Sequence, residues 1–418
     1  MGWNSWDCYM SAVTEAELLE NARYQAEHLL PYGWEYVTCD IQWYEPAAGT
    51  RPGCEYIPFA KLCMDEYGRL IPAENRFPSS AGGRGFGPIA AELHRLGLKF
   101  GIHIMRGVPK QAVFARTPVL NGNCTADEIA DPNAICLWNS DMFGTRKDCA
   151  GAQAYYDSLF ELYASWGVDF VKVDDIAHTG VAESGGYAAA HDIEMIRRAI
   201  DRCGRPIVLS LSPGPAPVEK AWHLRQNANM WRITNDFWDD WALLKNMFTR
   251  CEIWQSHVGP GCWPDCDMLP LGRIGVKFGQ PRQTRFTPAE QKTLLTLWSV
   301  FRSPLILGAE LPSLDEATLR LLTNRDVLRL NRHSFGARQI ARDDAQAVWV
   351  SQDEDGSHYA ALFNLSEETR EVSLDLRVLE GEAFDCRELW TGETLAARQT
   401  LSCRIEPHGA KLFRCRTR

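Results

Sequence analysis

Two hydrophobic periods alternate along the first three quarters of the chain. Short apolar runs of strand length recur between stretches in which apolar residues return every three or four positions, as on one face of a helix. Strands are expected at residues 1–6, 36–43, 99–105, 168–176, 207–212, 230–236 and 304–308, with a further segment of the series at 266–271. Helices are expected at residues 14–30, 89–96, 150–166, 188–202, 240–249 and 288–301. Roughly eight strand–helix units in a row predict an α/β fold of the (β/α)8 TIM barrel type.

A doubly wound open sheet is the alternative for this alternating pattern. Its usual mark is a GxGxxG run in the first turn between a strand and a helix. No such run follows the first expected strand of this chain. We therefore favour the barrel.

Two long insertions interrupt the barrel pattern. The first covers residues 45–87 and is rich in glycine, proline and arginine, and the second covers residues 106–148. Loops of this length within a compact domain are usually functional. Their length therefore indicates a role in function.

The pattern changes after about residue 331. Short strand-like runs are separated by turn residues, without helical spacing between them; they cover residues 347–351, 359–364, 371–374, 388–390 and 410–413. This is typical of a small antiparallel β-sandwich. The predicted domains are a barrel with the reaction centre over residues 1–331 and a C-terminal β-sandwich over residues 332–418.

The expected strand at residues 168–176 ends in charged residues. Lys172, Asp174 and Asp175 interrupt an apolar run, and burying charges without a partner costs several kcal/mol. A lone Lys–Asp pair is more often structural, but other expected strands end in polar residues too. In a (β/α)8 barrel these strand ends form the active-site face. The set comprises Trp6, Asp40, Trp43, His103, Arg106, Lys172, Asp174, Asp175, Ser210, Ser212, Arg232, Asp236 and Asp267.

Carboxylates, cations and indole rings on one rim suit the cleavage of a glycosidic bond. One carboxylate acts as nucleophile and another as acid/base, while aromatic faces pack on the sugar. Lys172 would keep Asp174 ionised, and Asp236 would have to carry a proton when the leaving oxygen arrives. A carbohydrate-binding barrel without catalysis is a second hypothesis. A metal-dependent hydrolase is a third, but only His103 is suitably placed as a ligand, and no metal-binding or cofactor motif is found.

Four sequence motifs belong with this chemistry. They are MGWNSW at residues 1–6, FVKVD at 170–174, WRITND at 231–236 and PDCDML at 264–269. In order and position they resemble the motifs of glycoside hydrolase family 27, which implies a (β/α)8 barrel with a C-terminal β-sandwich and a retaining exo-α-glycosidase. The resemblance implies Asp174 as nucleophile and Asp236 as acid/base. The implied sugar contacts are Trp6, Asp40, Ile41, His103, Lys172, Ser212, Arg232, Asp267 and Met268.

Departures from that family's pattern bear on the identity of the sugar. Ile41 stands where the family commonly has a second acid after Asp40, so one hydroxyl contact of galactose is missing or comes from elsewhere. The pair Ser212-Pro213 replaces the Glu-Trp of galactosidases, and a small residue at this position resembles the α-N-acetylgalactosaminidase branch. An α-galactosidase is the first expectation. The alternatives are an α-N-acetylgalactosaminidase and then a β-L-arabinopyranosidase, whose sugar lacks only the exocyclic carbon of galactose.

Composition narrows the partners and the compartment. The net charge of −10, without a long basic run, works against nucleic acid binding. No apolar run reaches the ~20 residues that cross a bilayer. We expect a small carbohydrate substrate as the partner, and the sequence leaves homo-oligomers open. The fourteen scattered cysteines are expected to be mostly free and buried, and together with the lack of an export signal they favour the cytoplasm.

Overall fold

The computed structural model describes residues 1–180, 186–381 and 383–418, and their contacts form two compact units. The first unit contains Met1–Asp236, Met268–Gln283 and Ile306–Leu314. The second unit contains Phe237–Asp267, Thr284–Leu305 and Asp315–Arg418. The boundary predicted after residue 331 follows the change from helices to strands, whereas the contacts group the last helices of the chain with the C-terminal strands.

A parallel sheet forms the centre of the first unit. Its strands lie in the order β9-β8-β7-β3-β2-β1-β13, and each neighbouring pair is parallel. The strands are β1 (Gly2–Asn4), β2 (Tyr36–Cys39), β3 (Lys99–Met105), β7 (Phe170–Asp174), β8 (Val208–Leu211), β9 (Met230–Arg232) and β13 (Ile306–Leu307). They confirm the predicted strands, although most are shorter than the apolar runs. The same unit contains a separate antiparallel pair, β11 (Arg273–Ile274) and β12 (Arg282–Gln283).

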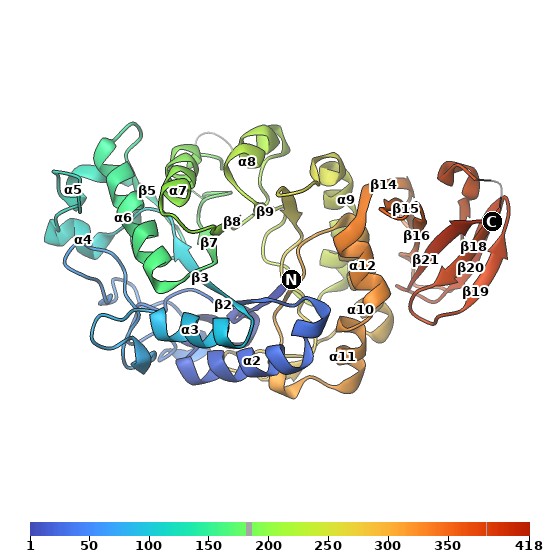
Figure 1. Ribbon diagram of the computed structural model, residues 1–418, viewed down its shortest axis with the longest axis horizontal. Helices are drawn as coiled ribbons and strands as arrows, with labels where there is room; N and C mark the ends of the chain where they lie inside the picture. The colour runs from blue at the N-terminus through green and yellow to red at the C-terminus, as the bar shows by residue number, and fades with distance from the viewer. Residues whose placement is uncertain (181–185, 382) are drawn as a thin grey trace. The chain divides into compact units, whose positions relative to one another are not determined.

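Helices alternate with these strands and pack along the sheet (Figure 1). They are α1 (Trp6–Tyr9), α2 (Glu15–His28), α3 (Gly87–Arg95), α6 (Ala150–Trp166), α7 (Ala190–Arg202) and α8 (Ala221–Asn227). Thr14 and Glu17 form a capping box at the start of α2. Helix α6 (Ala150–Trp166) covers the predicted residues and is capped by Gly167, whose φ of 82° suits a residue without a side chain. The alternation is that of the (β/α)8 TIM-barrel class, but helices α1 and α8 were not predicted.

Both long insertions belong to the first unit, and hydrogen bonds join them. The second contains α4 (Lys110–Ala115), α5 (Ala126–Ile129) and a small sheet of β4 (Val108–Pro109), β6 (Met142–Thr145) and β5 (Ala130–Ile135). The N–H of Leu62 donates to Oε1 of Gln111 at 2.9 Å, and Nε2 of Gln111 donates to the Leu62 carbonyl at 3.0 Å. The N–H of Phe59 donates to Oγ of Ser140 at 3.0 Å. These bonds fix the first insertion against the second.

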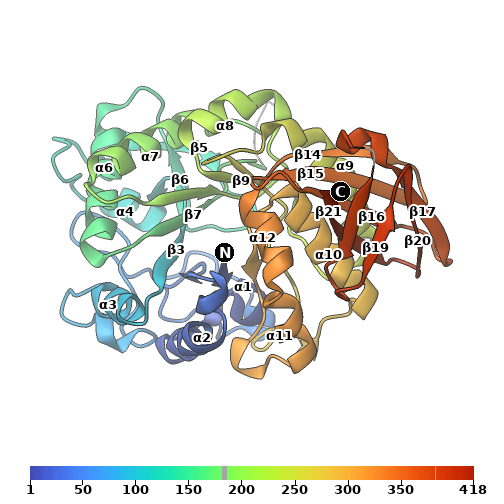
Figure 2. The same cartoon turned by 45° about the vertical axis from the view of Figure 1, so that its right-hand side comes forward.

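The second unit combines helices with antiparallel strands (Figures 1 and 2). Before the C-terminal strands it contains α9 (Trp241–Trp254), β10 (Trp263–Asp265), α10 (Pro288–Phe301), α11 (Glu316–Leu322) and α12 (Arg325–His333). One sheet has the strand order β14-β15-β16-β21-β18-β19, and a second sheet pairs β17 with β20. These strands are β14 (Ser334–Arg342), β15 (Gln346–Asp353), β16 (His358–Asn364), β17 (Arg370–Asp375), β18 (Phe384–Glu388), β19 (Thr394–Ala397), β20 (Thr400–Ile405) and β21 (Ala410–Thr417). The predicted sandwich is confirmed.

Some details of this unit differ from the prediction. Helices α11 and α12 and strands β14, β19 and β20 were not predicted, and β18 ends where the run predicted at 388–390 begins. The segment expected at 266–271 follows β10 rather than forming it. The run at 388–390 contains a large tryptophan and a leucine, which gave it the pattern of a strand although the chain turns there.

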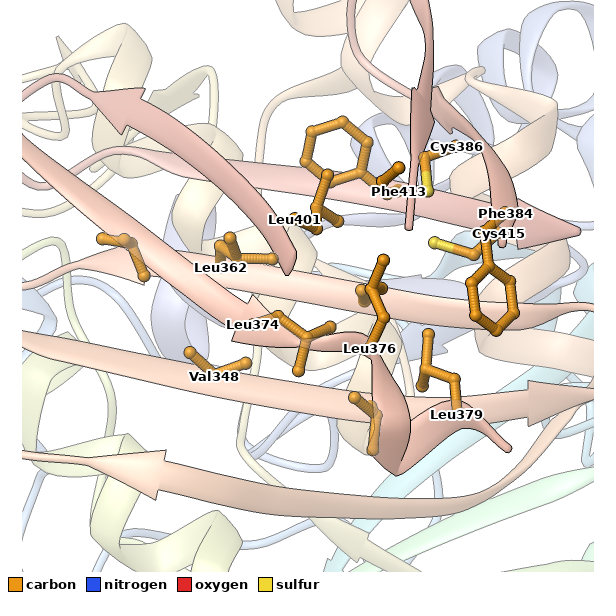
Figure 3. Packing of buried hydrophobic residues seen from close by; sticks show 14 of the residues in the cluster. Val348, Leu362, Leu374, Leu376, Leu379, Phe384, Cys386, Leu401, Phe413 and Cys415 are labelled. Atoms are coloured by element: carbon orange, nitrogen blue, oxygen red, sulfur yellow. The ribbon is translucent and has the colours of Figure 1, made fainter. Parts of the chain in front are cut away.

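Apolar side chains fill the space between the two sheets of the sandwich (Figure 3). Val348 and Leu362 of the larger sheet lie close to Leu374 of β17, and all three are buried. Helices α9 and α10 share in the packing of this unit. The ring centroids of Phe248 and Phe363 are 4.9 Å apart, and Nε1 of Trp390 donates a hydrogen bond of 3.0 Å to Oγ1 of Thr296. The sandwich and these helices therefore pack as one body.

Two expectations drawn from composition can be compared with the structure. All fourteen cysteines lie among the described residues and are free, and eight of them are buried, as predicted. In the described ranges, no helix has both the length and the apolar character needed to span a bilayer.

Candidate active site

One cavity of the first unit collects most of the predicted site residues. Its volume is about 460 Å³, within the range of about 300–1,000 Å³ typical of small-molecule sites. It is lined by Trp6, Met10, Asp40, Ile41, Tyr56, His103, Trp138, Lys172, Asp174, Pro213, Asn235 and Asp236. The cavity thus contains both predicted catalytic aspartates and five of the nine predicted sugar contacts.

Strand register brings the charged wall of the cavity together. Strands β3 and β7 pair so that His103 lies opposite Lys172 and Met105 lies opposite Asp174. Side chains two residues apart on a strand point to the same face, so Lys172 and Asp174 share one face. Nε2 of His103 lies 3.0 Å from Oδ2 of Asp174. A buried neighbour on the adjacent strand therefore holds the Asp174 carboxylate.

Asp40, directly after β2, is a fixed anion in this wall. Its Oδ2 accepts hydrogen bonds from Nδ2 of Asn4 at 2.8 Å and from Nζ of Lys172 at 3.0 Å, and its Oδ1 accepts one from the N–H of Ile41 at 2.8 Å. Burial by itself raises the pKa of Asp40, but Lys172, His103 and these hydrogen bonds outweigh burial and lower the pKa to about 2. Asp40 is therefore an ionised hydrogen-bond acceptor in the wall of the cavity.

The variant Asp40→Asn should lose a pH-dependent part of the stability. The folded pKa of about 2 lies below the unfolded value of about 3.9, so the ionised carboxyl stabilises the fold above about pH 4, and this contribution is lost as the pH falls towards 2. The difference between the folded and unfolded pKa corresponds to about 2–3 kcal/mol. Chemical denaturation should show that the free energies of unfolding of the wild type and of Asp40→Asn differ by about this amount near pH 7. The two values should converge as the pH falls towards 2. A difference independent of pH would contradict the role of the charge.

Asp174 stays ionised although it is buried. Burial raises its pKa, but the hydrogen bond and charge of His103, the ammonium of Lys172 and the N–H of Asp175 outweigh burial, so the pKa of Asp174 is lowered. A nucleophilic carboxyl group has to be in this ionised form. The surroundings of Asp174 therefore suit nucleophilic attack.

Asp175, the residue after Asp174, holds the turn on which Asp174 lies. Asp175 has a φ of 54°, a left-handed conformation that is uncommon for residues with side chains and is found at functional sites. Its carboxylate forms an ion pair of 2.9 Å with the buried Arg106. Burial raises the pKa of Asp175 to about 7, since Arg106 only partly opposes it and the charge of Asp174 adds to it. The pair fixes the turn that presents Asp174 to the cavity.

Asp236 lies in a more open part of the same cavity. Its side chain is 61% exposed, and its Oδ1 accepts a hydrogen bond of 3.2 Å from Nη2 of the buried Arg232. The neighbouring Asn235 also lines the cavity. Asp236 is therefore oriented by a fixed guanidinium while its carboxyl remains open to solvent.

Four predicted sugar contacts are not among the described residues that line this cavity: Ser212, Arg232, Asp267 and Met268. Arg232 donates a hydrogen bond to Asp236, which does line the cavity, and Ser212 and Met268 are buried. Asp267 belongs to the second unit, where its Oδ2 accepts a hydrogen bond of 2.7 Å from the N–H of Phe237. Their contact with the sugar stays a prediction.

Five lining residues were not named as sugar contacts from the sequence: Met10, Tyr56, Trp138, Pro213 and Asn235. Tyr56 and Trp138 come from the two long insertions, and their ring centroids are 5.7 Å apart. The length of the insertions was therefore the signal that could have found them. Pro213 and Asn235 adjoin residues that were singled out. No sequence signal pointed to Met10, whose φ of 44° and ψ of −125° are unusual.

The cavity can bind and cleave a small polar molecule with a ring. Two aspartates are available as a nucleophile and an acid, Lys172 and Asp40 as a hydrogen-bond donor and acceptor, and the indole of Trp6 as an apolar face. Among the residues that the structure describes, no group of three or more His, Cys, Asp or Glu is placed to hold a metal ion.

Comparisons with known proteins agree with this chemistry. The family description "Alpha galactosidase A" matches residues 134–333, and "Alpha galactosidase C-terminal beta sandwich domain" matches residues 343–415. The α-galactosidase of Cyamopsis tetragonoloba is 24% identical over 99% of this chain and 85% of its own length. The α-galactosidase of Oryza sativa subsp. japonica is 23% identical over 99% of this chain and 83% of its own length.

Solved structures include relatives with higher identity. A family 27 β-L-arabinopyranosidase from Geobacillus stearothermophilus is 54% identical, with a TM-score of 0.96 over 99% of this chain and 95% of that chain. A Bacillus halodurans protein provisionally assigned as an α-N-acetylgalactosaminidase is 49% identical, with a TM-score of 0.89 over 100% of this chain and 97% of that chain. Both similarities extend over the two units of this chain and include the residues that line the cavity. The chain belongs to glycoside hydrolase family 27 and is a glycoside hydrolase.

Proposed function

We propose that the chain removes a terminal sugar through two displacements at the aspartates of the cavity. Asp174 attacks the anomeric carbon while Asp236 gives its proton to the leaving oxygen, so the glycosidic bond breaks and a sugar ester forms on Asp174. Asp236, now ionised, takes a proton from a water molecule, which displaces the ester. The sugar leaves with its original anomeric configuration, and both carboxyl groups return to their starting forms.

The surroundings of the two aspartates support these different roles. The pKa of Asp174 is lowered, and attack requires a carboxylate. Asp236 must bring a proton in and later accept one from water, which its open position permits. Asp40 accepts hydrogen bonds from hydroxyls of the sugar, Lys172 donates to them, and Trp6 packs on its apolar face.

The terminal sugar that we propose is β-L-arabinopyranose. The observation that carries this choice is Ile41, which lines the cavity directly after Asp40 and is 1% exposed. An apolar side chain cannot hydrogen-bond the exocyclic hydroxyl of galactose, and a buried hydroxyl without a partner costs about 1–3 kcal/mol. Arabinopyranose has the same ring without that group. The activity in the name of the Geobacillus stearothermophilus relative supports the choice.

An α-linked galactose is the second candidate. The sequence alone put it first, and the curated relatives from Cyamopsis tetragonoloba and Oryza sativa are named as α-galactosidases. The two sugars have the same configuration around the ring, so Asp174 and Asp236 would act identically on both. The two candidates differ at position 41, because the exocyclic hydroxyl of galactose needs a hydrogen-bond partner there and arabinopyranose has no such hydroxyl.

Replacing Ile41 by Asp should shift the preference towards galactose. A carboxylate at this position offers the exocyclic hydroxyl an acceptor, and a contact of this kind is worth about tenfold or more in relative kcat/KM. The measurement compares kcat/KM for 4-nitrophenyl β-L-arabinopyranoside and 4-nitrophenyl α-D-galactopyranoside, with the 2-acetamido analogue as a third substrate. The variant Ile41→Asn controls for polarity without charge next to Asp40. A wild-type enzyme that prefers the galactoside would overturn the arabinopyranose proposal.

A further inference from the structure

We propose that an aromatic surface, which begins at the cavity wall and extends outward from it, binds the part of the substrate that leaves, and that this part is a sugar chain whose first ring stacks on Trp138. The surface consists of Tyr56, Phe59, Lys110, Phe114, Trp138 and Phe143, and we name it the leaving-group surface. The inference rests on the proposed function, because it extends the same site beyond the terminal sugar.

Trp138 connects this surface to the cavity. It lines the same cavity as Asp236, yet 41% of the residue is exposed, and its ring lies 5.7 Å from that of Tyr56. A group that stacks on Trp138 therefore borders the same cavity as Asp236, the proposed proton donor to the leaving oxygen. Neighbouring exposed aromatic rings at a cavity mouth are typical of binding surfaces, because contiguous apolar patches on the surface of a protein usually mark sites of interaction.

The surface continues away from Trp138 through further exposed rings. Phe59 is 77% exposed and is bound through its N–H to Ser140, two residues after Trp138. Nζ of Lys110 lies 5.9 Å from the ring centroid of Phe59 and 4.9 Å from that of Phe143. Phe114, 75% exposed, lies 6.4 Å from Phe143. Aromatic faces therefore alternate with a cation along the surface.

Hydrogen bonds hold the second insertion, which carries part of this surface, against the turn that follows Asp40 and Ile41 in the cavity wall. Oδ2 of Asp141 accepts hydrogen bonds from Nε2 of Gln42 and from the hydroxyl of Tyr44, both at 3.1 Å. Gln42 directly follows Ile41 and has a left-handed φ of 60°. The second insertion is thus tied to the strand end that lines the cavity. A surface held in place before binding loses little entropy when the substrate docks.

A sugar chain fits these groups better than a purely apolar partner. A pyranose presents C–H bonds on its faces and hydroxyls at its edge, so it can stack on an aromatic ring while a lysine or serine binds its hydroxyls. Ser140 and Lys110 lie among the rings in this way. The alternative occupant is a second copy of the chain, and the experiment below distinguishes the two.

The test uses two substrates that differ only in the leaving group. One is β-L-arabinopyranosyl fluoride, which has no ring to stack, and the other is a disaccharide of β-L-arabinopyranose linked to galactopyranose. Trp138→Ala should lower kcat/KM for the disaccharide about tenfold more than for the fluoride, because loss of one stacking contact is of this size. Trp138→Phe keeps a ring and should recover most of the difference. Trp222→Ala, which removes an exposed tryptophan elsewhere, should leave the ratio of the two substrates as in the wild type.

Failure of this inference can be distinguished from failure of the proposed function. If the wild type hydrolyses the fluoride but Trp138→Ala affects both substrates equally, the leaving-group surface is overturned and the proposed function stands. If the wild type hydrolyses neither arabinopyranosyl nor galactosyl fluoride, both are overturned. If Phe59→Ala changes the oligomeric state in light scattering and both substrates lose activity alike, the surface joins copies of the chain, which also overturns the inference.

Discussion

Asp174→Ala is expected to lower kcat by at least about 10⁴-fold, because removing a covalent nucleophile leaves only binding and the second carboxyl group. Turnover of 4-nitrophenyl β-L-arabinopyranoside by purified variant and wild type measures the loss. Azide adds a second readout. It is small enough to occupy the space of the lost carboxylate and should attack the anomeric carbon from that side, which gives a glycosyl azide of inverted configuration.

The neighbouring acid provides the control for this experiment. Asp175 lies on the same turn and pairs with Arg106, but the cavity is lined by Asp174. Asp175→Asn should therefore retain far more activity than Asp174→Ala, with no azide product. Near-normal kcat in Asp174→Ala, or inverted azide from Asp175→Asn, would refute the assignment of the nucleophile.

Asp236→Ala should cause the second large loss, and its size should depend on the leaving group. General acid catalysis contributes about 10²–10⁴-fold, most for substrates whose leaving oxygen needs a proton. We expect kcat/KM for the disaccharide to fall by about 10³-fold, and kcat/KM for arabinopyranosyl fluoride to fall much less, since fluoride leaves without protonation. Comparing these two substrates measures the acid role directly.

Azide also separates the two aspartates. In Asp236→Ala the ester on Asp174 still forms from an activated substrate, and azide needs no base to displace it. The product should therefore be a glycosyl azide of retained configuration, with a faster turnover than in water. The same loss for both leaving groups, or an inverted azide, would mean that Asp236 is not the acid/base. Arg232→Lys, which keeps the charge next to Asp236, should reduce activity much less than Asp236→Ala.

The charged core of the site was predictable because it violates a pattern. Lys172 and Asp174 interrupt an apolar strand at positions that share one face, and a buried charge on a strand needs a reason. Asp40 stood out similarly near the end of the second expected strand, at residues 36–43. The structure places these residues in one cavity with His103. Periodicity locates the strand ends to within a few residues, and the TIM-barrel rule then collects them on one face.

The aromatic part of the site was not predictable in the same way. Tyr56 and Trp138 lie in insertions without regular periodicity, and their proximity depends on hydrogen bonds between residues far apart in sequence, such as Leu62 and Gln111. Sequence patterns carry local information, whereas these contacts are nonlocal. The sequence could show only that the insertions were too long to be simple connections.

The missed secondary structure has a related cause. Helix α8 has seven residues and strand β19 has four, so neither provides enough positions for a clear period. Strand β20 pairs with β17, and its outward residues are polar or small. Elements of this size are stabilised by their neighbours rather than by their own sequence, and the neighbours are unknown before the fold is known.

The shared packing of α9 and α10 with the C-terminal strands has a consequence for how such a protein could evolve. Phe301 and Trp349 have ring centroids 6.2 Å apart, and Thr293 donates a hydrogen bond of 2.6 Å to the carbonyl of His408. A gene that lost its 3′ end would encode helices whose aromatic side chains, such as Phe301, are exposed to solvent. Hydrogen-bond donors such as Thr293 would lose their partners in the sandwich. We therefore expect the sandwich to be inherited together with helices α9 and α10, because exchange of this segment between lineages requires matching changes in both helices.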